Sequence, residues 1–325
     1  MSPLSSVRGT GGSINDTAVI QNQNTLSHPQ GGTKGQFVTT TVGNGTWTVP
    51  PGVTKICVVV VGGGGGGNDV DWKGTGGGGG GGLSWGNNMT VKPGDSLPYR
   101  IGEGGEGGPN TATSTKDGGD TWIKDSAGNY LVFAEGGEGG STPSDGNGGE
   151  GGKAPQGLAV HGGGDGGFGN SPYDYVGPYW TGARVFGGGG GGAGGYDGNG
   201  GTGGWGRVPS PYSGYDYYPG TDGYGGAGGG GMSGWGGGGV GLYGEGPSGE
   251  AKTPPGNSGG EGGSGGGDGN SSNPGGGPLG GGGASGGNFY PNDTGEGEDG
   301  NKGGMRIVWG CGVTFPDDAS EVYPS

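Results

Sequence analysis

Few residues in this 325-residue sequence have the types and spacing that catalysis requires. His28 and His161 are the two histidines, which gives little support for histidine-based acid–base chemistry. The segment 82–86 (Gly-Leu-Ser-Trp-Gly) has the spelling of a nucleophile elbow but lacks the strand–turn–helix context. Matches to Gly-x-Gly-x-x-Gly carry no information in a chain with 108 glycines, and there is no Gly-Lys-Ser/Thr. The sequence therefore predicts no enzyme activity and no cofactor.

Four glutamates follow predicted strands and are candidates for a metal site. Glu103, Glu106, Glu135 and Glu138 could bind a divalent cation if their carboxylates converge. The alternative, which we favour, is that they are solvated charges on a glycine-rich surface. We expect no resident metal.

Two tyrosine-rich inserts have the composition of a binding surface. They span Asn170–Trp180 and Pro209–Pro219, and both mix tyrosine with Ser, Gly, Asp and Pro. Tyrosine gives a large contact area at low entropic cost, while small polar residues adapt around it. Their aromatic residues, which we predict to bind a receptor, are Tyr173, Tyr175, Tyr179, Trp180, Tyr212, Tyr215, Tyr217 and Tyr218. The alternative is that they pack on each other or on a neighbouring subunit.

The charge balance excludes several classes of partner. The chain carries 29 Asp and Glu against 14 Lys and Arg, a formal net charge of -15. Nucleic acids and anionic lipid surfaces both require clustered basic residues, so we expect neither as a partner. The longest apolar stretch, Ile56–Val61, is too short to span a bilayer, and we expect no membrane insertion. No signal peptide is visible after Met1, which predicts synthesis and assembly in a cytoplasm.

Short β-prone segments precede and follow the glycine-rich part of the chain. Residues 37–42 and 46–49 flank Gly-Asn-Gly in a hairpin-like pattern, and Lys55–Val61 is typical of a strand buried on both faces. Further strands are expected at 89–91, 97–101, 121–124, 130–134 and 305–309, with a hairpin at the turn 126–129. Glycine costs about 1 kcal/mol per helical position relative to alanine, so we predict an all-β or irregular fold with essentially no α-helix.

The glycine blocks leave two alternatives open. Low hydrophobicity with high net charge is a signature of disorder. Glycine runs can instead form polyglycine II-like helices that pack side by side through backbone hydrogen bonds. We predict a packed slab of such helices, carried by a small β-sheet frame in which strands 55–61 and 305–309 pair antiparallel. That pairing would bring Cys57 and Cys311 close together, and we favour two reduced, buried thiols over a disulfide.

We divide the chain into four parts. Residues 1–36 form an extended attachment arm, with Ile14, Val19 and Ile20 as candidate contacts to a larger particle. Residues 37–140 form the β-strand frame with the first glycine runs, residues 141–303 the glycine-rich region with aromatic loops, and residues 304–325 the closing strand and an acidic tail.

The segments around the glycine blocks resemble a phage protein family. Trp47–Val61 followed by a glycine run, Val91–Asp95 followed by Ile101–Gly105, and Gly304–Gly310 with Phe315-Pro316 are similar to the framing motifs of the glycine-rich domain of tailed phages. The resemblance covers roughly residues 37–316. A relative with similar architecture is the distal tail-fibre adhesin, whose polyglycine II sandwich carries loops that bind outer-membrane proteins. No clear counterpart of the fibre-attachment domain of that adhesin is visible in this sequence, and the expected strand frame is longer.

The resemblance implies a non-enzymatic virion protein in a phage tail or fibre. The first hypothesis is an adhesin that binds a host surface protein or glycan through the tyrosine-rich loops. The alternative is a structural virion component (a fibre, decoration or adaptor protein) whose loops contact other subunits. Other phage structural proteins are the expected partners in both cases, and a homo-oligomer is compatible with either.

Overall fold

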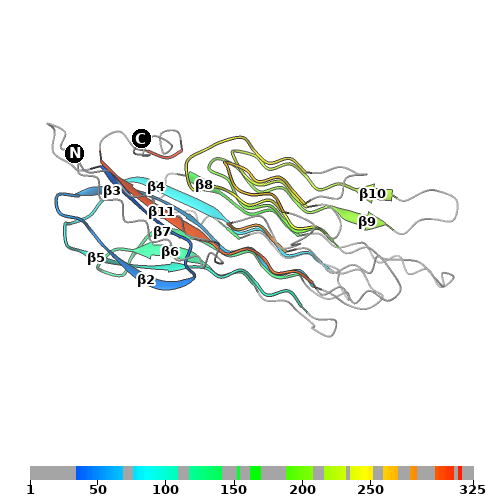
Figure 1. The fold of residues 1–325 in the computed structure, drawn as a ribbon, viewed down its shortest axis with the longest axis horizontal. Helices are drawn as coiled ribbons and strands as arrows, with labels where there is room; N and C mark the ends of the chain where they lie inside the picture. The colour runs from blue at the N-terminus through cyan, green and yellow to red at the C-terminus, as the bar shows by residue number, and fades with distance from the viewer. Residues whose placement is uncertain are drawn as a thin grey trace, which may run out of the picture.

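The fold is built from β-strands and glycine-rich segments (Figure 1). The computed structural model describes residues 34–68, 76–108, 117–140, 152–153, 162–169, 188–207, 216–231, 235–251, 259–269, 279–283, 297–310 and 314–316. These ranges contain no α-helix, which confirms the all-β prediction. Within them, no helix has the length and apolar character needed to cross a membrane.

Two antiparallel sheets form a frame at one end of the molecule (Figure 1). The five-stranded sheet has the order β1-β11-β3-β4-β8. Its strands are β1 (Gly35–Thr39), β11 (Gly304–Trp309), β3 (Lys55–Val61), β4 (Leu83–Thr90) and β8 (Gly162–Gly164). The four-stranded sheet has the order β2-β5-β6-β7. Its strands are β2 (Gly43–Thr48), β5 (Ser96–Ile101), β6 (Thr121–Lys124) and β7 (Tyr130–Ala134).

Strand β3 is buried on both faces because its apolar run has no polar alternation. Ile56, Val58 and Val60 face a core shared with the four-stranded sheet. Val59 and Val61 face a second core, made with residues that follow the glycine runs. Burying each such side chain contributes roughly 1.5–3 kcal/mol. The five-stranded sheet is therefore the middle layer of the frame.

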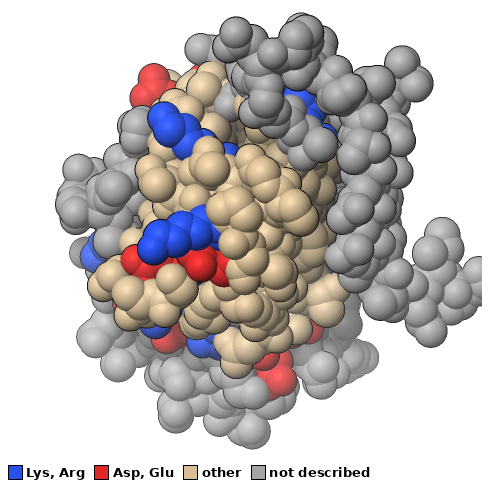
Figure 2. Space-filling model, turned by 90° about the vertical axis from the view of Figure 1, so that its left-hand side faces the viewer, with Lys and Arg blue, Asp and Glu red and all other residues tan. Residues whose placement is uncertain are grey.

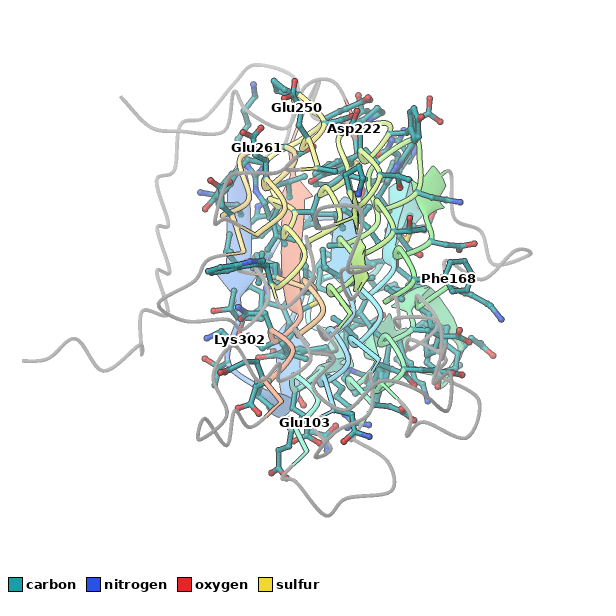
Figure 3. All side chains as sticks on the ribbon, turned by 90° about the vertical axis from the view of Figure 1, so that its right-hand side faces the viewer. Glu103, Phe168, Asp222, Glu250, Glu261 and Lys302 are labelled. Atoms are coloured by element: carbon teal, nitrogen blue, oxygen red, sulfur yellow. The ribbon has the colours of Figure 1, made fainter. Side chains whose placement is uncertain are left out.

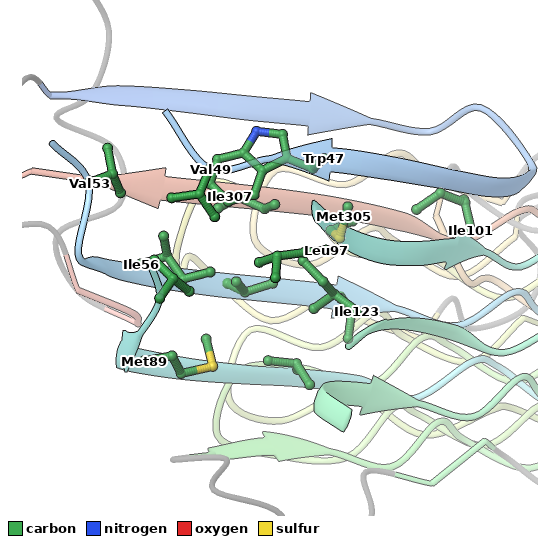
Figure 4. Packing of buried hydrophobic residues seen from close by; sticks show 14 of the residues in the cluster. Trp47, Val49, Val53, Ile56, Met89, Leu97, Ile101, Ile123, Met305 and Ile307 are labelled. Atoms are coloured by element: carbon green, nitrogen blue, oxygen red, sulfur yellow. The ribbon is translucent and has the colours of Figure 1, made fainter. Parts of the chain in front are cut away.

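The core between the two sheets is filled by large side chains from both (Figure 4). Trp47 and Leu97 of the four-stranded sheet meet Met305 and Ile307 of β11. The predicted antiparallel pairing of 55–61 with 305–309 is confirmed, with Val58 opposite Ile307. The hairpin between β6 and β7 is confirmed as well.

The hairpin expected at residues 37–49 is wrong. Strand β1 pairs with β11, and β2 pairs with β5 in the other sheet. Phe37 and Trp47 thereby approach the same core from opposite sheets, with Phe37 5.8 Å from Tyr99 and Trp47 5.5 Å from Trp309 between ring centroids. A hairpin would have left one face of both strands without a partner sheet.

Strand β4 is longer than the predicted segment 89–91, because it begins at Leu83. Leu83 and Trp85 are buried in the second core, whose residues outside the sheet strands come from segments with no recognisable apolar pattern. The segment 82–86 therefore enters an extended strand rather than a nucleophile elbow, and the side chain of Ser84 is fully buried.

The strands of the frame continue directly into glycine runs. The runs 62–68, 102–108 and 135–140 follow β3, β5 and β7, while 76–82 and 297–303 precede β4 and β11. They lie alongside further glycine-rich segments, including 188–204, 219–231 and 235–251 (Figure 1). We call these described segments together the glycine layer. Its runs lie along the long axis of the molecule.

Hydrogen bonds between the runs repeat every three residues. The N–H groups of Gly62, Gly65 and Asn68 donate to the carbonyls of Gly82, Gly79 and Gly76 at 2.9, 2.8 and 3.1 Å. The residues between them bond in other directions: Gly63 N–H donates to Gly119 at 2.9 Å, and Gly64 N–H donates to Asn301 at 2.7 Å. One run is thus held by neighbours on three sides.

The interior of the glycine layer has no room for side chains. A Cβ atom at Gly64, Gly65 or Gly66 would overlap the carbonyl oxygen of Gly281, Glu138 or Glu106, respectively. These three successive positions point in different directions, so every side of the run is closed by backbone. Such close approach is what glycine alone permits.

A polar junction joins the frame to the glycine layer. Trp85 Nε1 donates to the carbonyl of Tyr196 at 2.8 Å, and Tyr196 Oη donates to the carbonyl of Gly241 at 3.1 Å. The buried Arg306 of β11 donates through Nη1 to the carbonyl of Leu242 at 3.2 Å. Burial raises the pKa of Tyr196 above its ordinary value, so this phenol stays neutral and keeps its proton for the bond.

Candidate functional site

The connections between glycine runs gather at the end of the glycine layer far from the frame, which we call the loop end. Gly67 marks this level, because its carbonyl accepts from Gly108 N–H at 3.0 Å and its N–H donates to Glu298 at 2.8 Å. Gly297 N–H in turn donates to Gly108 at 3.1 Å. The described residues that flank inserts near this level are Asn68, Gly76, Gly108, Gly140, Gly169, Gly188, Gly231, Trp235, Gly283 and Gly297.

The opposite end of the molecule carries the outer ends of the terminal strands. Gly35 at the start of β1 pairs with Trp309 at the end of β11, and both lie on the side of the frame that faces away from the glycine layer. The two ends of the described structure therefore differ: the terminal strands meet at one end, and the ten insert-flanking residues named above lie near the other.

A two-stranded sheet lies toward the loop end (Figure 1). It consists of β9 (Trp205–Arg207) and β10 (Asp216–Tyr218), with Tyr217 opposite Gly206 and Tyr218 opposite Trp205. Tyr217 and Tyr218, both predicted site residues, are thus placed in β10, and the second tyrosine-rich insert is anchored on a hairpin.

The other predicted site residues lie outside the described ranges. They are Tyr173, Tyr175, Tyr179, Trp180, Tyr212 and Tyr215 among the receptor candidates, and Ile14, Val19 and Ile20 in the N-terminal arm. Cys311 also lies outside these ranges, whereas Cys57 is buried. Burial raises the pKa of the Cys57 thiol, partly offset by a hydrogen bond from Asn88 N–H.

Phe168 is an exposed aromatic residue that the sequence analysis missed. Its side chain is 53% exposed and points outward from the layer (Figure 3). Phe168 stands two residues before Asn170, where the first tyrosine-rich insert begins, and its carbonyl accepts from Gly203 N–H at 2.8 Å. The sequence feature that could have indicated its exposure is the glycine on either side, because glycine supplies no apolar side chain to bury the ring. Phe168 extends the candidate surface of the loop end.

Tyr224 does not belong to that surface, although it is 69% exposed. Its N–H donates to Asn199 at 3.1 Å, next to the turn in which Gly195 N–H bonds to Gly198. This turn lies beside the second core, at the frame side of the glycine layer.

Polar side chains cap glycine N–H groups at the margin of the layer. Asp117 and Asp120 accept from Gly139 and Gly136 at 2.8 and 3.1 Å, keeping the three-residue spacing on both runs. Asp222 accepts in the same way from Ala251 N–H at 2.8 Å. Carboxylates around the layer are seen end-on in Figure 3. The acidic composition thus has a structural role, because marginal runs would otherwise present open donors.

The four glutamates proposed as an alternative metal site contribute their backbones to the layer. The carbonyls of Glu103, Glu135 and Glu138 accept from Gly119, Gly82 and Gly79 at 2.8, 3.0 and 2.9 Å. Among the described residues, no three His, Cys, Asp or Glu side chains form a group that could hold a metal ion.

One comparison with known proteins gives a match. A family model described as a glycine-rich domain matches residues 39–310, which is more than half of the chain. This range begins in β1 and ends just after β11, so it includes the frame and the glycine layer. No curated protein matches the sequence.

Proposed function

The chain belongs to the glycine-rich domain family, and from that premise we propose that it is a non-enzymatic tailed-phage virion protein that binds a host cell-surface receptor. The observation that carries the proposal is the gathering of inserts at the loop end, opposite the terminal strands. An adhesin needs one end for attachment and one for recognition. The resemblance of the framing motifs to tailed-phage proteins supports the location in a virion.

We infer that the glycine runs are polyglycine II helices. The three-residue repeat of their hydrogen bonds supports this, because polyglycine II has three residues per turn and no internal hydrogen bonds. A scaffold of this kind fixes the starting points of the inserts through backbone contacts. Recognition is then assigned to insert side chains.

The receptor contacts are assigned to the tyrosine-rich inserts and to Phe168. Tyr217 and Tyr218 start from the β10 strand, and Phe168 stands exposed beside the first insert. Rigid aromatic side chains on a fixed scaffold lose little conformational entropy on binding. Their receptor is a surface protein or a glycan of the host.

The test replaces Tyr212, Tyr215, Tyr217 and Tyr218 together by serine in the phage that carries the protein. We expect normal particle yield and loss of adsorption to the host, measured as free phage after mixing with cells. Tyr224→Ser is the matched control, because this tyrosine is exposed but lies away from the loop end. Adsorption that survives replacement of both inserts contradicts the adhesin function. Failure of the particles to assemble identifies a structural virion component instead.

A further inference from the structure

We propose that the frame end of the molecule docks on an acidic protein surface of the particle that carries it. We define the frame end by Lys34 and the exposed turns 50–54, 91–95 and 125–129, which lie opposite the loop end. The first two turns are neighbours in space: Val91 N–H donates to Thr54 at 3.0 Å, and Lys55 pairs with Thr90. We infer the chemistry of the partner from the charged and aromatic side chains of this end.

Basic side chains are concentrated at the frame end. Lys34, Lys55 and Lys92 are exposed there, and Lys124 ends strand β6 beside the turn 125–129. Figure 2 looks onto this end and shows separated lysine and arginine side chains, with carboxylates directly beside the central ones, on a surface that is otherwise mostly uncharged. The remaining described lysines, Lys153 and Lys302, lie beside the glycine runs.

The carboxylates at the frame end offset part of this charge. Asp95 and Asp125 are the acidic residues of its turns. The Asp125 carboxylate is engaged within its own turn, where it accepts from Ala127 N–H at 2.9 Å and from Asn129 N–H at 2.8 Å. Most other described carboxylates lie on the glycine layer. The described residues of the frame end thus carry four lysines against two aspartates, in a protein with a formal net charge of -15.

An aromatic cluster lies next to the lysines, on the outer face of the four-stranded sheet. Trp122, Tyr130 and Phe133 are arranged edge to face, with ring centroids 5.9 Å apart for Trp122–Tyr130 and 5.1 Å apart for Tyr130–Phe133. Lys124 Nζ lies 4.7 Å from the Trp122 centroid and 4.2 Å from the Tyr130 centroid. Aromatic residues beside a cation are typical of protein–protein interfaces.

These features favour an acidic protein over a nucleic acid. The lysines sit on separate turns and do not form a continuous stripe that could follow a phosphate backbone. The Lys124 ammonium lies over the rings of Trp122 and Tyr130, where a stacked base would have to displace it. Complementary charge would also orient the molecule, because the acidic glycine layer is repelled by the same partner.

The identity of the partner as part of a phage particle rests on the proposed function, whereas the charge preference of the frame end does not. The experiment therefore uses the full chain and immobilised poly-L-glutamate as the acidic probe. Lys55→Glu/Lys92→Glu is compared with Lys153→Glu/Lys302→Glu, which changes the net charge equally on the glycine layer. Both are checked by thermal unfolding, with glutamine at the same positions as a second pair.

We expect the wild-type chain to be retained at low salt and released as the salt concentration rises. Lys55→Glu/Lys92→Glu should bind about tenfold more weakly or not at all, whereas the layer variant should retain most of the affinity. No retention of the wild-type chain, or an equal loss in both variants, overturns the proposal. Stronger retention on double-stranded DNA than on poly-L-glutamate assigns the frame end to nucleic acid instead.

Discussion

At the residue scale, the aspartates of the glycine layer act as hydrogen-bond acceptors for backbone donors at its margin. Asp117 and Asp120 cap Gly139 and Gly136 three residues apart, which matches the repeat of the runs. An uncapped marginal run would offer a row of donors to any other chain, as an open sheet edge does. These side chains therefore limit lateral association as well as stabilising the layer.

Replacing both aspartates tests this role. Asp117→Ala/Asp120→Ala should lower the free energy of unfolding by roughly 1 kcal/mol per lost bond, because each bond ends on a charged but solvent-accessible acceptor. The measurement is denaturant unfolding at neutral pH. Asp117→Asn/Asp120→Asn is the control, since it keeps an acceptor oxygen at each position. Equal loss in the two variants would show that charge, rather than the hydrogen bond, is responsible.

The side chain of Asp125 gives a residue-scale view of pH. Hydrogen bonds from Asn129 hold the pKa of this carboxyl below its ordinary value. The folded pKa lies below the unfolded one, so the contribution of Asp125 to stability is present above the unfolded pKa and is lost as the pH falls through the folded pKa. The turn of the β6–β7 hairpin is thus stabilised less at acidic pH, and its stability does not change near neutral pH.

At the element scale, the glycine runs are segments that pack against one another without side chains. Their positions are fixed by the carbonyl oxygens of neighbouring runs. A methyl group added at an interior glycine would therefore meet the backbone of a neighbouring run whichever way it points. Backbone cannot move aside as a flexible side chain can. A single substitution in the interior is therefore expected to displace two runs at once.

Gly65→Ala measures this cost. Its Cβ would overlap the Glu138 carbonyl, and we expect destabilisation on the order of 3 kcal/mol or more. Gly52→Ala is the control, because no atom lies within 4 Å of its Cβ and its φ of +80° alone makes alanine unfavourable, by about 1 kcal/mol. Thermal unfolding of both variants gives the comparison. A Gly65→Ala variant as stable as Gly52→Ala would contradict the packing of the layer.

Much of the frame could be predicted from the sequence, because its strands carry side-chain patterns. Lys55–Val61 has an uninterrupted apolar run and 126–129 a turn composition, and both predictions are confirmed. The partner of β1 could not be predicted, because the segments that contain Phe37 and Trp47 have the same pattern whether they pair with each other or lie in separate sheets. The neighbours of each glycine run could not be predicted either. Glycine has no side chain, so the sequence of a run contains no pattern that indicates which other runs lie beside it.

The candidate site was predictable in composition and only partly in position. The tyrosine-rich inserts stand out against glycine, but β9 and β10, which anchor the second one, have three residues each and no strand pattern. Phe168 was missed because a lone aromatic residue among glycines is not part of any apolar period. The spacing of Asp117 and Asp120 was visible in the sequence, yet its meaning depends on the three-residue repeat of the runs.

At the scale of the whole molecule, the frame end and the loop end lie at opposite ends of the long axis (Figure 1). The proposed function and the proposed docking surface use one end each, so they predict a fixed orientation on the particle. A peptide tag inserted directly after Gly108, at the loop end, should be accessible to a labelled antibody. A tag in the turn 91–95 should be shielded or should prevent attachment. Electron microscopy of labelled particles distinguishes the two, and equal labelling of both tags contradicts the orientation.

The direction of the glycine runs has a mechanical consequence for a molecule held at both ends. A pull between a host cell and a particle would act along the long axis, parallel to the runs and perpendicular to the hydrogen bonds that join them. Such a load shears many bonds at the same time instead of opening them one after another. Gly62, Gly63 and Gly64 bond to three different neighbours, so a run cannot slide without breaking bonds on three sides. The layer would resist extension with little help from side chains, and tension would be passed from the inserts to the frame without unfolding.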